Sequence, residues 1–299
     1  LTLKWIKEHR CHPGKLLNFE DISTKYGGSW TYMSLEKTSA EQMQYLKKIK
    51  RRKCIILLLR ILVLVILISV WEIATQAQWM DSFIFSSPSR IVDTFFRLYS
   101  DGSIWTHVWT TLWETVVGFL LGTIFGILIA IILWVSETCS KVLEPYLVVG
   151  NALPKIALGP VFIVWLGAGS TSIIAVAVSV SLIVTVLEVY TGFKEADPEK
   201  IRLVRSFGAT KRQVMEKVIL PSSFPVMMNA LKVNVGLSWV GVIVGEFLVS
   251  RAGLGYLIVY GGQVFQLDLV MTSVVILSIL AALMYFGVQL LGKGISSKY

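Results

Sequence analysis

The run LWETVVGFLLGTIFGILIAIILWV, from Leu112 to Val135, decides the fold class of this chain. It is longer than the roughly 20 mostly apolar residues that a helix needs to cross a membrane. Other segments have the same character or nearly so, and they are Ile55–Thr75, Tyr146–Leu166, Ser172–Thr191, Val226–Val249 and Leu269–Leu291. The sequence therefore predicts an all-α integral membrane protein with six transmembrane helices.

Composition and charge placement agree with a membrane protein. Of the 299 residues, 55% are hydrophobic and only 16% are charged, whereas a soluble domain averages about 25% charged residues. The net charge of +9 comes from Lys and Arg gathered beside the apolar segments, so it indicates topology and no nucleic-acid partner. Basic residues precede the first span, separate the fourth from the fifth and follow the sixth, which predicts that both termini are cytoplasmic.

The spans divide the chain into four predicted regions. Residues 1–53 form a cytoplasmic N-terminal tail, in which 1–32 are either an over-extended start or a disordered tail, because Met33 resembles a natural start. Residues 54–105 hold the first transmembrane helix and an external loop, 106–292 form the core of the remaining spans, and 293–299 form a cytoplasmic C-terminal tail. The segment HRCHP, His9 to Pro13, lacks a second pair of ligands, so no metal site is predicted.

The stretch EADPEKIRLVRSFGATKRQVMEKVILP, residues 195–221, is rich in charge yet lies between two apolar spans. Asp197-Pro198 is a helix start, Gly208 suits a helix end, and Thr210 to Gln213 has the spacing of a capping box. The segment therefore predicts a helix, a glycine turn and a second short helix, before Pro221 returns the chain to the membrane. Such helices either lie on lipid headgroups or dock into a soluble partner.

The spacing after Gly208 resembles a motif of the permease subunits of bacterial ABC importers, the cytoplasmic "EAA loop". Nine residues follow Gly208, then Val218, Ile219 and Leu220-Pro221, as in that motif. The triplet that names the motif is replaced by Arg202, Leu203 and Val204, so its acidic contact is absent here. The segments 151–169 and 230–258 are similar to the third and fifth spans of the nitrate, sulfonate and taurine permeases.

The resemblance implies the type-1 importer permease fold in a bacterial plasma membrane. It also implies cytoplasmic ATPase subunits, a second and identical permease copy, an extracellular solute-binding protein and surrounding membrane lipid as partners. The chain would need no cofactor and would not be an enzyme, because it carries no phosphate-binding loop of its own. The implied ATPase-coupling residues are Arg202, Leu203, Val204, Phe207, Gly208, Ala209, Leu220 and Pro221.

Within the membrane, the sequence offers a packing face and two candidates for the solute path. Gly118, Gly122 and Gly126 recur every four residues and predict a close helix–helix contact. Lys155 and Glu246 are intramembrane charges that either contact a solute or serve structure. The solute is a small molecule, for which a sulfonate, nitrate, taurine or a thiamine precursor stay open. The alternative function is a secondary transporter or channel that acts alone.

Overall fold

The structure is a computed structural model that describes residues 30–296. All the regular elements among the described residues are helices, with no strand, which confirms the all-α prediction. They separate into two units: residues up to Ser69, which form most of α3 (Trp30–Gln76), and residues from Val70 onward. The predictions for residues 1–29, including the segment His9 to Pro13, and for 297–299 lie outside the described residues.

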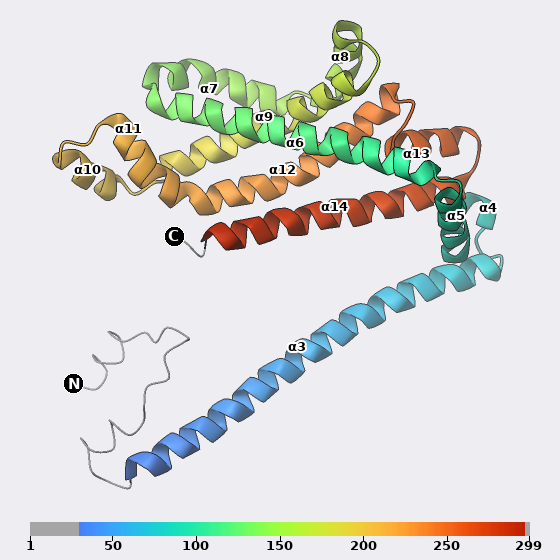
Figure 1. Cartoon of the computed structure of the whole chain (residues 1–299), viewed down its shortest axis with the longest axis horizontal. Coiled ribbons are helices and arrows are strands. Elements are labelled where there is room, and N and C mark those ends of the chain that lie inside the picture. Colours follow the sequence, from blue (N-terminus) through green and yellow to red (C-terminus); the bar gives the residue numbers. More distant parts are fainter. Residues whose placement is uncertain (1–29, 297–299) are drawn as a thin grey trace. The chain divides into compact units, whose positions relative to one another are not determined.

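The second unit holds the remaining helices in a simple order along the chain (Figure 1). Their bounds are α4 (Ser82–Phe85), α5 (Pro88–Ser100), α6 (Ser103–Val135), α7 (Glu137–Ala152), η1 (Lys155–Leu158), α8 (Gly159–Leu166), α9 (Ser170–Lys194), α10 (Pro198–Ser206), α11 (Lys211–Val214), η2 (Met215–Ile219), α12 (Leu220–Val249), α13 (Leu254–Gln263) and α14 (Leu267–Ser296).

Five described helical segments are long and apolar enough to cross a membrane, namely Cys54–Gln76, Ser103–Val135, Ser170–Lys194, Lys211–Val249 and Leu267–Gly294. The predicted third span, Tyr146–Leu166, is sharply bent, because α7 and the η1–α8 segment meet at 90°. Leu153, which precedes Pro154, adopts an extended backbone, as residues before proline tend to do. The count reaches six spans only if this bent pair crosses as one.

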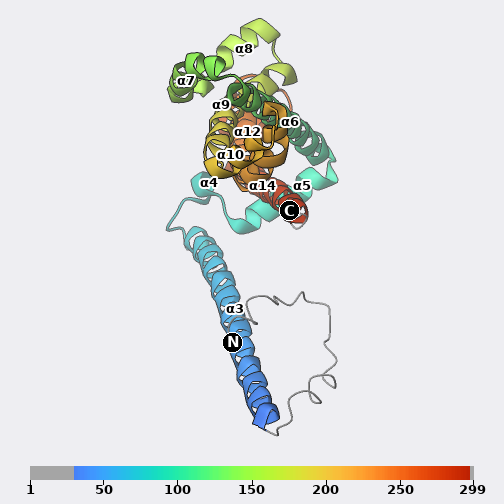
Figure 2. The ribbon, with the colours of Figure 1, turned by 90° about the vertical axis from the view of Figure 1, so that its left-hand side faces the viewer.

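The centre of the second unit is a contact of α6, α9 and α12, which lie side by side in both views (Figure 2). Gly118, Gly122 and Gly126 of α6 face α9, and the residues they meet are Ala177, Ser181 and Thr185. Both sets recur every four residues, and the residue numbers increase in the same direction along the contact. The helices α6 and α9 therefore run parallel. Small residues at such a contact let two helix backbones approach closely.

Ala177 is the point where all three helices meet. It is fully buried, and a Cβ added at Gly118 would lie 2.9 Å from its Cβ. From the other side, a Cβ added at Gly241 of α12 would lie only 2.5 Å from its Cα. Ordinary contacts between carbon atoms are about 3.5–4.0 Å, so neither glycine position has room for a side chain.

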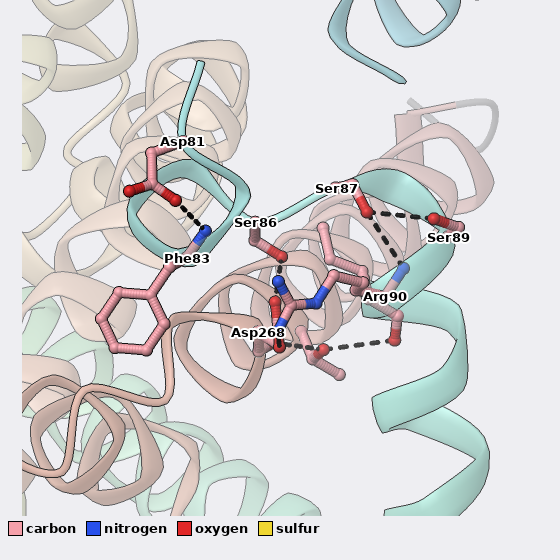
Figure 3. A network of polar contacts seen from close by, with 9 residues as sticks. Asp81, Phe83, Ser86, Ser87, Ser89, Arg90 and Asp268 are labelled. Atoms are coloured by element: carbon pink, nitrogen blue, oxygen red, sulfur yellow. Dashed lines mark hydrogen bonds and ion pairs between the residues drawn. The ribbon is translucent and has the colours of Figure 1, made fainter. Parts of the chain in front are cut away.

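A polar network ties the connection before α5 to the start of α14 (Figure 3). The Arg90 guanidinium forms an ion pair with Asp268 at 2.8 Å, and the Ser86 hydroxyl donates to Asp268 Oδ1 at 2.7 Å. One turn further on, the Thr272 hydroxyl donates to the Ile91 carbonyl at 3.2 Å. These contacts fix α5 on α14 across a wide separation in sequence.

Candidate functional site

The charged segment 195–221 begins with the helix that the sequence predicts. The Asp197 side chain accepts a hydrogen bond from the Glu199 N–H at 2.9 Å, and Pro198 occupies the first turn of α10. Gly208 follows the end of this helix, and its φ of 82° is left-handed and therefore suits glycine. The Ala209 N–H donates back to the Val204 carbonyl at 3.3 Å and closes the turn.

The capping box that follows is also confirmed. The Thr210 N–H donates to Gln213 Oε1 at 2.8 Å, and the Gln213 N–H donates to Thr210 Oγ1 at 3.3 Å. The second helix begins there as predicted, but it does not end near Pro221, because Lys211–Val249 is helical without a break. Residues Met215–Ile219 form a π-helical turn just before Pro221, whose missing N–H such an irregular turn accommodates.

The coupling residues implied by the resemblance differ in exposure. Phe207 and Leu203 project outward, with 82% and 58% of their surface exposed, and Arg202 is exposed beside them. Val204 and Ala209 instead pack against the buried cluster that contains Val214, Met215 and Ile219. The turn therefore presents an apolar pair, Leu203 and Phe207, while its other side is anchored to the body of the chain.

A second polar site lies at the other end of α12. The carboxyl of Glu246, 1% exposed, accepts hydrogen bonds from the Thr111 hydroxyl at 2.7 Å and from the Gly255 N–H. The Leu254 N–H donates to Thr111 Oγ1 at 2.7 Å. A Cβ at Gly253, whose φ is 122°, would lie 2.4 Å from Glu246 Oε1. Glu246 thus holds the turn before α13 in place.

Glu114 of α6 is the residue that sequence reasoning missed. It is 1% exposed, and Glu246 and Ser170 are its polar neighbours. Both carboxyl oxygens are buried next to these neighbours, and neither oxygen has a hydrogen bond of ordinary length and angle in the described structure. The signal was present as the single charge within the apolar run Leu112–Val135, because ionisable residues inside a span favour a functional role.

Lys155 lies at the bend between α7 and η1, not within a continuous span. Its Nζ donates to the Asn151 carbonyl at 3.0 Å and approaches Asn151 Oδ1 at 3.4 Å. A cation at the carbonyl end of a helix is favourable because of the helix dipole. The ammonium therefore has local partners near the end of α7, and the contacts do not include Glu246.

Residues 122–298, more than half of the chain, match the family described as the binding-protein-dependent transport system inner membrane component. The chain belongs to this family. It is therefore a permease of the ABC importer class and a multi-pass inner-membrane protein, as its apolar helices also indicate.

Relatives of this permease cover most of its length. A probable ABC transporter permease of Haemophilus influenzae is 30% identical over 234 residues, or 78% of this chain and 94% of that protein. The taurine transport system permease protein TauC of Escherichia coli is 23% identical over 235 residues, covering 77% and 86%. A solved bacterial ABC transporter that imports the polysaccharide alginate shares the fold, with a TM-score of 0.60 at 13% identity, covering 84% and 99%.

Proposed function

We propose that this permease forms the path for a small solute in an ATP-driven importer and that the 195–221 segment docks on a cytoplasmic ATPase subunit. ATP hydrolysis would occur in that partner, and an extracellular binding protein would deliver the solute to two identical copies of the permease. Both termini would be cytoplasmic, as the distribution of Lys and Arg favours. The alternative to this proposal is a transporter or channel that acts without an ATPase.

The observation that carries the proposal is the exposed apolar pair at the Gly208 turn. Leu203 and Phe207 are exposed on a turn that charged side chains surround, and a few such anchors supply most of the binding energy at protein interfaces. Below the turn, Val214 and Ile219 are fully buried. A partner that moves the turn would therefore move the start of α12, because Lys211–Val249 is one helix.

The solute is proposed only by class. The relative named for taurine transport supports a small sulfonate, and nitrate or a thiamine precursor stay open. Lys155 and Glu246 were the predicted contacts in the solute path. Their hydrogen bonds to Asn151 and to the Gly253–Gly255 turn favour structural roles for both, so the proposal does not assign solute contact to them.

The test is recovery of an ATPase from detergent-solubilised native membranes by a tag at the C-terminus. The variants are the pair Leu203→Ser with Phe207→Ser, and Gly208→Trp, which forces a bulky residue into a left-handed backbone. A matched control is Trp165→Ala, since Trp165 is another exposed aromatic side chain, at 73%, on the distant α8. We expect the wild type and the control to recover the ATPase and both loop variants to lose it.

Two results would overturn the proposal. If the wild type recovers no ATPase, the chain acts alone, and transport driven by an ion gradient becomes the function to test. If the loop variants recover as much ATPase as the wild type, the partner docks elsewhere. Equal amounts of each variant in the membrane fraction would exclude loss of the protein as the cause.

A further inference from the structure

A cavity of about 460 Å³ opens beside the polar site at the end of the bundle opposite the 195–221 segment. Its lining includes Thr110 and Glu114 of α6, Ser170 at the start of α9, and Arg251 just after α12. Ligand pockets in proteins measure roughly 300–1,000 Å³. The cavity is therefore large enough for a small organic molecule and offers polar groups from three elements.

The acidic side of this cavity offers an acceptor for a positively charged group. Both oxygens of Glu114 are buried without a hydrogen-bond donor, and the nearby Glu246 already accepts from Thr111 and Gly255. A carboxylate that is buried without a donor or an opposite charge is energetically unfavourable. An ammonium group supplies both, because it carries a positive charge and three N–H donors.

The other side of the cavity carries the opposite charge. Arg251 is exposed, and no carboxylate of the described residues forms an ion pair with it. A guanidinium binds planar or multi-oxygen acids through several N–H donors at once. The cavity thus combines an unpaired acid with an unpaired base, and these do not pair with each other. A metal ion fits less well, since the described residues contain no group of three ligating side chains.

We propose that this cavity binds a small zwitterion, with its ammonium group on Glu114 and its acidic group on Arg251. The inference rests on the proposed function in one respect, because it identifies the bound zwitterion with the class of solute that the permease transports. Ser170 and Thr110 add hydroxyl groups that can accept or donate around the ammonium. The recognition requires both charged ends of the ligand.

The test is direct binding to the full-length chain in lipid nanodiscs, measured by isothermal titration. Three probes of similar size separate the two charges: taurine carries both, ethanesulfonate carries only the acid, and ethylamine only the ammonium. The variants are Glu114→Gln, which removes the negative charge, and Glu114→Asp, which keeps it. Arg251→Gln removes the positive charge. Glu188→Gln and Arg97→Gln are matched controls, since neither residue lines the cavity.

We expect taurine to bind at least tenfold more tightly than either probe with one charge. Glu114→Gln should remove the preference for taurine over ethanesulfonate, and Arg251→Gln should remove the preference over ethylamine. Glu114→Asp should retain part of the preference, and both controls should behave as wild type. Equal binding of the three probes, an unchanged preference in Glu114→Gln, or no binding of taurine would overturn the proposal. Because ATPase recovery is measured separately, such a result would leave the proposed function standing.

Discussion

Replacing Gly241 by alanine is the most direct test of the three-helix centre. The new Cβ would lie 2.5 Å from Ala177 Cα and 3.2 Å from Ala177 N. These are backbone atoms, so no side-chain rotation relieves the clash, and α9 and α12 must separate by about 1 Å to reach ordinary contact. Overpacking of this kind costs about 1–3 kcal/mol, against which alanine gains about 0.5–1 kcal/mol over glycine within a helix.

The same helix provides graded controls. A Cβ at Gly245 would lie 3.0 Å from Ile173 Cα, and a Cβ at Gly236 would have nothing within 4 Å. We therefore expect melting temperature to fall most for Gly241→Ala, less for Gly245→Ala, and not at all for Gly236→Ala. At about 2–4 °C per kcal/mol for a chain of comparable size, the first variant should melt a few degrees below wild type.

The assay is thermal unfolding of the purified chain in detergent, followed by tryptophan fluorescence, with 10 tryptophans as probes. The order of the three variants matters more than any single value, because the helix propensity of alanine contributes equally to each. If Gly241→Ala melts at or above Gly236→Ala, the close approach of α12 to Ala177 is wrong, and the three helices do not meet as described.

Three further predictions concern single hydrogen-bonded groups. Glu246→Ala leaves the Gly255 N–H without its acceptor, at a cost of about 1–3 kcal/mol, so hydrogen exchange over 253–257 should accelerate; unchanged exchange would contradict the anchoring role. Thr210→Ala removes a helix cap worth about 1 kcal/mol and should speed exchange over 211–214, whereas Thr210→Ser should not. Asp268→Asn breaks a partly exposed ion pair with Arg90 worth up to about 1 kcal/mol, and should speed proteolysis over 77–88 without lowering expression.

Features governed by neighbouring residues could be predicted from the sequence. The Asp197 cap, the left-handed Gly208 and the Thr210–Gln213 box each depend on groups within four positions of one another. The apolar runs gave the spans, because the membrane imposes a length and a composition. The regular spacing of Gly118, Gly122 and Gly126 predicted a packing face on this helix. It did not predict that the face packs against α9.

Features governed by distant residues could not be predicted in this way. Glu246 was visible as a charge, but its partners Thr111 and Gly255 come from two other parts of the chain. Glu114 was not predicted as a site residue, because its burial without an ordinary hydrogen bond becomes visible only in the folded structure. The sharp bend at Pro154 was marked by proline, yet proline within a membrane helix is often tolerated, so the sequence alone did not separate a kink from a break.

The polar network that joins α5 and the segment before it to α14 has a consequence for how the protein is made. Ser86 and its acceptor Asp268 are separated by 182 positions, and a ribosome adds roughly 5–20 residues per second. On that scale, the segment before α5 waits about 10–35 seconds for its acceptor to be synthesised. Until then, the Ser86 hydroxyl lacks the acceptor that it has in the folded chain, so the contact between the segment before α5 and α14 cannot form before α14 has been made.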